Sequence, residues 1–312
     1  MSGAGRPRVP GRAWEVALAA EDVLGEGPHW DAASGRLLRV DIRAGAVRGW
    51  RPETGERDEL AVGAGASVAI PAACGGLLVA AGDELAIWRD GRAVPLARID
   101  SDRPVTRLND GKCDARGRLW IGTWATDGAA VAAVHRVSPD GVAVRVLDGL
   151  RASNGIAFDG PGELLYVTDS PRGAIDVLDL DLDGGTVACV RPFARIEPSG
   201  GIPDGIAADV EGGIWVAVFG GGAVHRYDRG GALDAVVELP VSHPTSVAFG
   251  GERRDVLYVT TARHRLSAAE AAAQPLAGSV LAIEPGVAGL PVAAFGAPPD
   301  DGGPAGTRRG WT

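Results

Sequence analysis

Four oxygen-bearing side chains occupy the same position of a repeated sequence motif. The copies begin Glu26-Gly-Pro-His-Trp-Asp31, Asn109-Asp-Gly-Lys-Cys-Asp114, Asn154-Gly-Ile-Ala-Phe-Asp159 and Asp204-Gly-Ile-Ala-Ala-Asp209. Two further copies place Ala66 and Thr245 at that position. Carboxylates that meet at one point repel each other unless a cation lies between them. The set therefore favours one divalent metal ion, and its all-oxygen chemistry suits Ca²⁺, Mg²⁺ or Mn²⁺, with Zn²⁺ and Fe²⁺ also compatible.

The alternative for each copy is a simple turn. Asn-Gly and Asp-Gly are common in tight turns, so any one copy on its own indicates a turn. Glu26 does not fit this explanation, because glutamate is a poor turn residue, and turns do not require the same phase in every copy. Taken together, the copies favour the metal site.

The elements that would position these side chains are short strands in a repeat. A second apolar strand follows each copy at a spacing of roughly 40 to 50 residues, which is the period of four-stranded propeller blades. These strands read Leu37-Leu-Arg-Val40, Leu77-Leu-Val-Ala80, Leu119-Trp-Ile-Gly122, Leu165-Tyr-Val-Thr168, Ile214-Trp-Val-Ala217 and Leu257-Tyr-Val-Thr260. The sequence predicts an all-β, six-bladed β-propeller in which the motif position converges on the central axis.

The propeller is expected to span residues 12–296 as one domain, with tails at 1–11 and 297–312 that are rich in Gly, Pro and Arg. The last repeat lacks an outermost strand, and Trp14-Glu-Val-Ala-Leu18 precedes the first repeat. We therefore expect the N-terminal segment to complete the final blade and remove an open sheet edge. Residues 266–274 form the one candidate for a short helix.

Charge and composition exclude several classes of partner. The formal net charge is −9 and the chain has a single lysine, Lys112, which argues against a nucleic-acid partner. The N-terminus lacks the apolar stretch of a signal peptide, and no apolar run approaches the ~20 residues that span a bilayer. The three cysteines have neither metal-site nor disulfide-framework spacing. These features predict a cytoplasmic protein without a membrane partner, and a monomer is expected for a closed propeller.

The ordered motifs resemble the SMP-30/gluconolactonase/regucalcin-like family. The resemblance is carried by Leu24-Gly-Glu-Gly-Pro-His-Trp30, Arg107-Leu-Asn-Asp-Gly-Lys-Cys-Asp114, Ser153-Asn-Gly-Ile-Ala-Phe158, Ile202-Pro-Asp-Gly-Ile206 and Pro244-Thr-Ser-Val-Ala-Phe-Gly-Gly251. It implies a six-bladed propeller whose metal ligands are Glu26, Asn154 and Asp204. It also implies that Arg107 and Asn109 bind substrate oxygens. Asp127 takes the place of an acidic residue that contacts sugar hydroxyls in the family, where glutamate is more usual.

The resemblance and the motif position together predict a metal-dependent hydrolase that opens a small lactone, such as a sugar lactone. The metal would polarise the carbonyl, and Asp204, or a water that it orders, would act as the general base. Two alternatives stay open at this point. One is an esterase or phosphotriesterase of the same propeller type, and the other is a metal- or ligand-binding propeller without turnover.

Overall fold

The computed structural model describes residues 14–297. The regular structure of this part is almost entirely strand, and its strands form six four-stranded antiparallel sheets. The expected all-β, six-bladed propeller is therefore confirmed. The expected tails at 1–11 and 297–312 lie outside the described residues, except for Ala297.

Each sheet is one blade, and the first three blades follow one another along the chain. Blade 1 contains β2 (Gly25–Asp31), β3 (Arg36–Asp41), β4 (Ala46–Trp50) and β5 (Arg57–Ala61). Blade 2 contains β6 (Ala66–Pro71), β7 (Leu77–Ala81), β8 (Glu84–Arg89) and β9 (Arg92–Arg98). Blade 3 contains β10 (Thr106–Cys113), β11 (Leu119–Ala125), β12 (Ala132–Val137) and β13 (Ala143–Leu150).

The remaining blades complete the ring. Blade 4 contains β14 (Ser153–Phe158), β15 (Leu164–Asp169), β16 (Ala174–Asp181) and β17 (Thr186–Arg195). Blade 5 contains β18 (Ile202–Ala208), β19 (Ile214–Phe219), β20 (Ala223–Tyr227) and β21 (Leu233–Glu238). Blade 6 contains β22 (Pro244–Gly250), β23 (Val256–Thr261), β24 (Val280–Ile283) and β1 (Trp14–Leu18).

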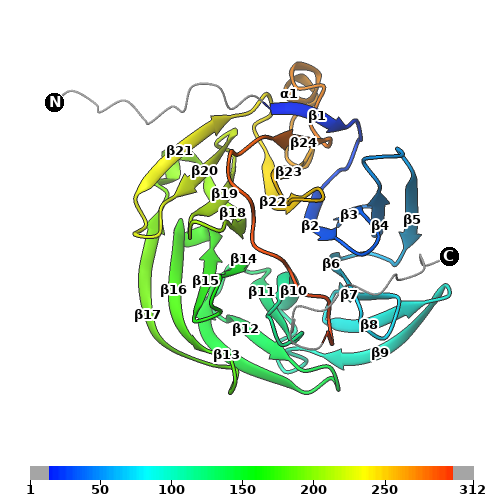
Figure 1. Cartoon of the computed structure of the whole chain (residues 1–312), viewed down its shortest axis with the longest axis vertical. Coiled ribbons are helices and arrows are strands. Elements are labelled where there is room, and N and C mark those ends of the chain that lie inside the picture. The colour runs from blue at the N-terminus through cyan, green and yellow to red at the C-terminus, as the bar shows by residue number, and fades with distance from the viewer. Residues whose placement is uncertain (1–13, 298–312) are drawn as a thin grey trace.

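The N-terminal strand closes the ring, as the sequence predicted. Strand β1 pairs with β24 from the other end of the chain, with Trp14 opposite Ile283 and Val16 opposite Leu281. Figure 1 shows β1 beside β24, on the outside of blade 6. The first strand of each blade lies innermost, and consecutive inner strands contact one another around the ring. This arrangement brings the motif position of every blade to the central channel.

Six separate apolar clusters hold the blades together, one at each boundary between neighbours. Leu38 and Val40 of blade 1, for example, pack with Ala69 and Val79 of blade 2. The inner and middle strands are largely buried, whereas outer strands such as β5 and β9 are mostly exposed. Alternation of apolar residues across each sheet therefore supplies both faces that a blade must bury.

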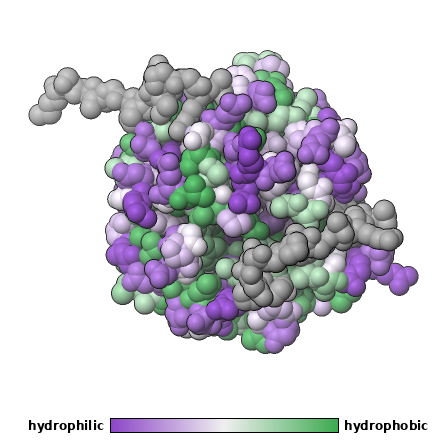
Figure 2. Space-filling model, viewed as in Figure 1, coloured by the Kyte–Doolittle hydropathy of each residue, from purple (hydrophilic) through white to green (hydrophobic). Residues whose placement is uncertain are grey.

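The chain after β24 crosses one face of the ring. Between Glu284 and Ala297 it forms backbone hydrogen bonds with the hairpin loops of four blades, through Arg254, Ala208, Val210, Pro71, Ala73 and Gly117. Figure 1 shows this segment passing over the middle of the ring, and Figure 2 shows polar and apolar residues interspersed on the same face. The segment covers the end of the channel at which the inner strands finish. The candidate site lies at the opposite end, where they begin.

Helical structure is confined to short connections. The α-helix α1 (Ala268–Ala273) lies within the region expected to be helical, and the 3₁₀ turns η1 (Ser170–Arg172) and η2 (Pro198–Gly200) precede β16 and β18. None of the helices in residues 14–297 has the length and apolar character needed to cross a bilayer.

Candidate functional site

The motif residues are buried at the starts of four inner strands. Glu26 lies on β2, Asn109 on β10, Asn154 on β14 and Asp204 on β18. Their exposed fractions are only 9, 6, 5 and 6%, respectively. Side chains of this polarity are rarely buried without a partner. Their shared, buried position therefore marks them as the candidate site.

A β-bulge shapes the start of each inner strand. The pairing register shifts there in all six blades, for example between Ser153 and Ile156 on β14 and between Pro203 and Ile206 on β18. A bulge leaves residues outside the regular ladder and turns their side chains away from the sheet face. It therefore turns Asn154 and Asp204 toward the channel.

Glycine after the motif residue lets neighbouring inner strands approach closely. A Cβ placed on Gly155 would lie 2.6 Å from the backbone oxygen of Asp204 and from the backbone nitrogen of Ile206. A Cβ on Gly205 would collide with the side chain of Ser246. The Asn-Gly and Asp-Gly dipeptides thus serve strand packing as well as the bulge.

Asn154 and Asp204 are in direct contact. The Nδ2 atom of Asn154 donates hydrogen bonds to the carboxylate of Asp204 and to Oγ of Ser170, the latter at 3.2 Å. The bond to Asp204 uses one carboxylate oxygen, Oδ1, and leaves Oδ2 for another partner. Glu26 accepts a hydrogen bond of 3.0 Å from the backbone N–H of Gly27. The structure thus brings two of the three predicted metal ligands, Asn154 and Asp204, into direct contact. The charge of the third, Glu26, acts on the carboxyl group of Asp204.

The carboxyl groups of the site hold their protons more tightly than usual. Burial, followed by the nearby charge of Asp110, raises the pKa of Glu26 to about 8. Burial, followed by the charges of Glu26 and Asp110, raises the pKa of Asp204 well above its usual range. Mutual repulsion of this kind arises only between neighbouring carboxylates. The site therefore favours positive charge.

Asp110 is a site residue that the sequence reasoning missed. It follows Asn109 at the position where the neighbouring copies have Gly27, Gly155 and Gly205. Its Oδ1 atom accepts a hydrogen bond of 2.7 Å from the N–H of Gly111, and burial raises its pKa. The departure from glycine in the aligned repeats was the signal that could have identified it.

Lys112, the single lysine of the chain, is a second residue to which the sequence pattern assigns no role. Its Nζ atom donates a hydrogen bond of 2.9 Å to the backbone oxygen of Ile206, so its side chain reaches from blade 3 to blade 5. Burial lowers its pKa, whereas the charge of Asp110 raises it. Lys112 thus ties β10 to β18 two residues beyond Asp204.

Arg107 and Asn109 form the adjoining side of the site. The Nη1 atom of Arg107 donates hydrogen bonds of 3.0 Å to Asn109 Oδ1 and to the backbone oxygen of Leu108. Asn109 in turn donates a hydrogen bond of 2.9 Å to the backbone oxygen of Ser153, next to Asn154. The guanidinium carbon of Arg107 lies 5.2 Å from the centre of the Trp124 ring, which is within cation–π range. The structure thus joins Arg107 and Asn109, two of the three predicted substrate-binding residues, to the strands of the metal ligands.

Asp127 lies apart from these residues. It is exposed in the turn after β11, where its Oδ1 atom accepts a hydrogen bond of 2.9 Å from the N–H of Ala129. Within residues 14–297 it has no hydrogen bond or ion pair with the other five predicted site residues. A role in substrate binding therefore stays a prediction.

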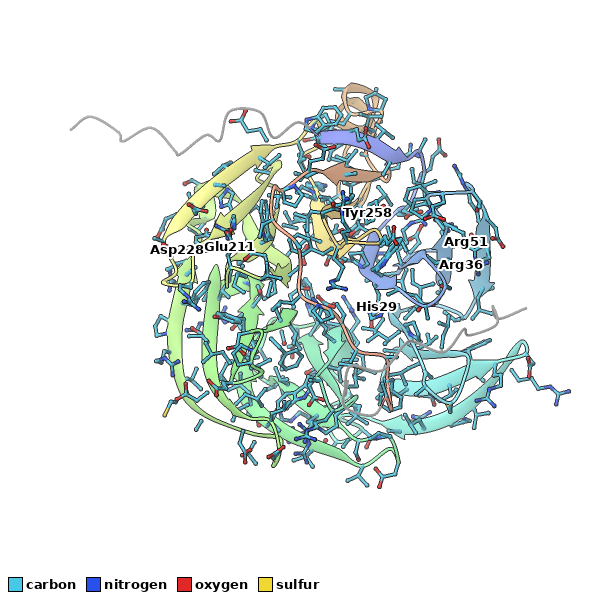
Figure 3. The ribbon with its side chains drawn as sticks, in the orientation of Figure 1. His29, Arg36, Arg51, Glu211, Asp228 and Tyr258 are labelled. Atoms are coloured by element: carbon cyan, nitrogen blue, oxygen red, sulfur yellow. The ribbon has the colours of Figure 1, made fainter. Side chains whose placement is uncertain are left out.

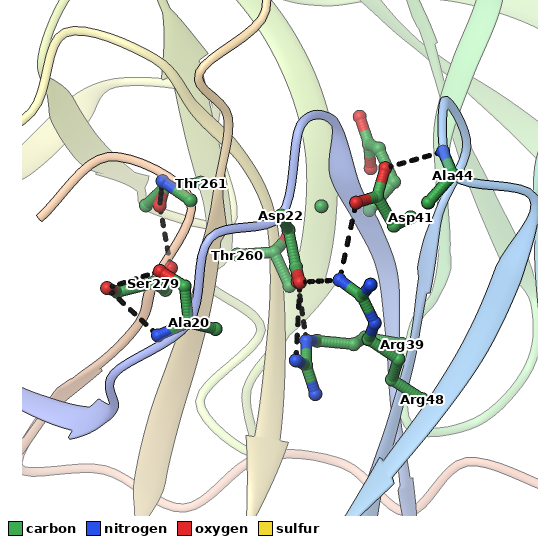
Figure 4. A network of polar contacts seen from close by, with 12 residues as sticks. Ala20, Asp22, Arg39, Asp41, Ala44, Arg48, Thr260, Thr261 and Ser279 are labelled. Carbon is green, nitrogen blue, oxygen red and sulfur yellow. Dashed lines mark hydrogen bonds and ion pairs between the residues drawn. The ribbon is translucent and has the colours of Figure 1, made fainter. Parts of the chain in front are cut away.

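Buried ion pairs hold the start of β2 in place. The Asp22 carboxylate accepts a hydrogen bond of 2.6 Å from Arg39 Nε and a further one from Arg48, as Figure 4 shows. Asp41 accepts hydrogen bonds from the N–H groups of Val23 and Leu24 at 2.9 and 3.2 Å. These contacts fix the backbone that leads to Glu26.

Two histidines line the neighbouring regions without joining the site. His29 is buried, and burial lowers its pKa to about 4. Figure 3 shows it toward the middle of the ring, whereas Arg51, Glu211 and Asp228 lie toward the rim. His243 stacks on Phe219, with ring centres 4.2 Å apart.

The chemistry of the donor set fits a hard divalent cation. No group of three or more His, Cys, Asp or Glu side chains in the described part of the chain is arranged to hold a metal by itself. The candidate set instead combines the carboxylates of Glu26 and Asp204 with the carboxamide of Asn154. Carboxylate and amide oxygens are the ligands of Ca²⁺ and Mg²⁺. A cation between them would offset the burial and the carboxylate repulsion that raise the pKa of both groups.

Comparison with known proteins shows that the chain is similar to regucalcins over most of its length. The chain is 35% identical to regucalcin from Bos taurus over 287 residues, which cover 89% of this chain and 96% of that protein. It is 34% identical to regucalcin from Homo sapiens over 278 residues, with coverage of 86 and 93%.

Solved structures show the same likeness in three dimensions. A structure described as a calcium-binding protein, regucalcin, from Agrobacterium tumefaciens superposes with a TM-score of 0.85 at 29% identity, covering 91% of this chain and 97% of that one. A luciferin-regenerating enzyme gives a TM-score of 0.84 at 28% identity, with coverage of 92 and 100%. The family model for the SMP-30/Gluconolactonase/LRE-like region matches residues 24–263. The chain therefore belongs to the SMP-30/gluconolactonase/LRE-like family.

Proposed function

We propose that this protein is a metal-dependent lactonase that opens a small lactone, of the sugar-lactone type, to its hydroxy acid. The observation that carries the proposal is the pair of buried carboxyl groups, Glu26 and Asp204, beside the Asn154 carboxamide and the Arg107–Asn109 pair. Family membership supports it, because the family takes part of its name from gluconolactonase. Regucalcin from Agrobacterium tumefaciens is described as calcium-binding, which supports a divalent cation here.

The cation would be held by Glu26, Asn154 and Asp204. When bound, a divalent cation polarises the lactone carbonyl and stabilises the negative charge that develops on its oxygen. Asn154 would have to turn its amide so that Oδ1 faces the cation, since Nδ2 now faces Asp204. Such a turn changes no backbone contact of β14.

The side chains of this protein would perform the remaining steps. Arg107 has a forked guanidinium that is already oriented by Asn109 and Trp124, and it would hold oxygens of the substrate. Asp204 would accept a proton from the attacking water through an oxygen of its carboxylate. The proton would then pass to the ring oxygen that leaves as a hydroxyl group.

The test is hydrolysis of a panel of sugar lactones, monitored by the release of acid. The protein is first treated with a chelator, and Ca²⁺, Mg²⁺, Mn²⁺, Zn²⁺ or Fe²⁺ is then added. We expect at least one metal to restore turnover. Asp204→Asn should lower kcat/KM by about 100-fold or more, the range for loss of a general base. The matched control is Asp140→Asn, which alters an exposed carboxylate between β12 and β13 that contacts Ser138; it should stay within about twofold of wild type.

The same panel separates the alternatives. Turnover of a phosphotriester or an aryl ester without turnover of any lactone would replace the lactonase with the esterase type. Metal binding without turnover of any of these compounds would indicate a binding propeller. Full activity of Asp204→Asn would show that another group is the base.

A further inference from the structure

An arginine at the same end of the ring as the candidate site is held by an imidazole instead of a carboxylate. Arg43 is exposed in the turn between β3 and β4, and its Nη2 atom lies 3.2 Å from Nε2 of His264. These two residues are 221 positions apart in the sequence and come from blades 1 and 6. Both lie in connections at the end of the channel where the inner strands begin, which is the end that holds the candidate site.

The backbone around Arg43 and His264 is fixed by shared contacts. Asp41 accepts hydrogen bonds of 3.2 Å from the N–H groups of Arg43 and Ala44, and it also binds the N–H of Val23. The backbone oxygen of Val23 accepts the N–H of His264 at 2.8 Å. The turn that holds Arg43 and the loop that holds His264 therefore meet at Val23, three residues before Glu26.

The charge of Arg43 also acts on Arg107. The pKa of Arg107 is lowered chiefly by burial and further by the charge of Arg43, while Glu26 raises it. The positive charges of the two guanidinium groups thus act on each other, and an anion bound between them would relieve this repulsion.

The charge of Glu26 acts on Arg107, but Arg43 has no carboxylate partner among the described residues. Within the described residues neither Arg43 nor Arg107 forms an ion pair, although acidic residues outnumber arginine and lysine by 40 to 31 in the chain. Other arginines that the fold orients have such partners, as Arg39 has Asp22 at 2.6 Å. His264 has a lowered pKa because of burial and the charge of Arg43, so it accepts the Arg43 N–H as a neutral ring and leaves the positive charge free.

We propose that Arg43, oriented by His264, forms an anion subsite together with Arg107, and that the substrate lactone carries a carboxylate or a phosphate group. This inference rests on the proposed lactonase function and deepens it by naming the substrate class. Guanidinium groups bind both anions through paired N–H donors, which explains why the two sources share one chemistry. A neutral sugar lactone would leave the charge of Arg43 without an anionic partner among the described residues.

The kinetic test compares three lactones on the metal-loaded full chain: glucono-1,5-lactone, its 6-phosphate, and a lactone of glucaric acid that retains a free carboxylate. We expect kcat/KM for at least one of the anionic lactones to exceed that for the neutral one by tenfold or more. Arg43→Gln should lower this ratio about tenfold. The control Arg92→Gln removes the same charge from the exposed outer strand β9 and should leave the ratio unchanged.

The three lactones distinguish a phosphate subsite from a carboxylate subsite and also test whether the anion subsite exists. Preference for the phosphorylated lactone identifies a phosphate subsite, and preference for the glucaric acid lactone identifies a carboxylate subsite. Equal use of all three lactones by wild type would overturn the proposal. An equal loss of activity toward charged and neutral lactones in Arg43→Gln would also overturn it, because the residue would then act on folding or on the whole site.

A binding measurement keeps this inference separate from the lactonase proposal. If wild type turns over no lactone, calorimetry on the metal-loaded chain with D-glucose, D-glucuronate and D-glucose 6-phosphate still tests the subsite. We expect the favoured anionic sugar to bind at least tenfold more tightly than glucose, with most of the difference lost in Arg43→Gln and kept in Arg92→Gln. A difference that survives in Arg43→Gln would reject the subsite even though an anion binds elsewhere.

Discussion

Glu26 and Asp204 differ from other buried carboxylates of the protein in what lies opposite them. Asp22 is paired with Arg39 at 2.6 Å, and Asp209 with Arg226 at 2.8 Å. Glu26 and Asp204 accept hydrogen bonds from a backbone N–H and an amide instead. A buried carboxylate that lacks a cationic partner either takes up a proton or binds a metal. This contrast separates the candidate metal ligands from the carboxylates that stabilise the fold.

Metal binding should therefore release protons. The pKa of Glu26 in the metal-free protein is about 8, so this group is mostly protonated at pH 7 and must ionise to bind a cation. Calorimetric titration with Ca²⁺ or Mn²⁺ in buffers of different ionisation enthalpy should show net proton release at pH 7 that declines as the pH rises through 8. Glu26→Gln should release fewer protons and bind more weakly, whereas Asp140→Asn should match wild type. Binding without proton release at pH 7 would contradict the assignment.

The same shift has a consequence for stability. A carboxyl group whose pKa is raised by folding stabilises the folded state fully below its unfolded pKa of about 4.5, and this contribution is lost as the pH rises through about 8. The metal-free protein should thus lose stability from this group between these values. The increase in Tm caused by the metal should grow over the same window.

At the scale of the strand, the sequence repeat predicted most of the strands and their order. The six second strands, the closing segment at Trp14 and the motif residues all follow from a period that is visible in the chain. Asp110 was missed because its effect on Glu26 depends on the assembly of blades 1 and 3 around one channel, although its departure from the glycine of the neighbouring copies was visible in the sequence. The Arg43–His264 contact could not be predicted, since two irregular connections from distant parts of the chain meet there without a shared pattern. The segment after β24 has no periodicity, and only the assembled ring shows what it covers.

The close packing of β14 against β18 predicts that Gly155 cannot be enlarged. A Cβ on Gly155 would lie 2.6 Å from backbone atoms of Asp204 and Ile206, where no side chain can move aside. Gly155→Ala should cost about 1–3 kcal/mol of stability, the range for overpacking, and should weaken metal binding by displacing Asp204. The measurement is urea unfolding together with metal titration.

Gly160 provides the matched control for this substitution. A Cβ there would lie 3.6 Å from a side-chain carbon of Leu290, which is an ordinary contact. Gly160→Ala should leave metal affinity unchanged. If Gly155→Ala were as stable as wild type and bound the metal equally well, the strands would not need this close approach, and the bulge alone would position Asn154 and Asp204.

At the scale of the whole ring, each blade depends on both of its neighbours. One apolar cluster lies at each of the six boundaries. A ring opened at one boundary would expose both blade faces of that cluster to water. The channel is also completed by residues from several blades, with Glu26 from blade 1, Asn109 from blade 3 and Asp204 from blade 5. Closure of the ring is therefore a condition for the site as well as for the fold.

The closing strand should consequently control the stability of the entire ring. Leu18 on β1 is 3% exposed and packs in the cluster that joins blades 6 and 1, whereas Val16 on the same strand is 39% exposed. Leu18→Ala should cost about 2–5 kcal/mol, as for other buried leucines, and Val16→Ala should cost much less. Because the blades support one another, urea unfolding followed by tryptophan fluorescence and by far-UV circular dichroism should give coincident transitions that Leu18→Ala moves together. Separate transitions in that variant would mean that blade 6 can open alone. Metal affinity would then survive the first transition only if Glu26, Asn154 and Asp204 stay assembled after blade 6 has opened.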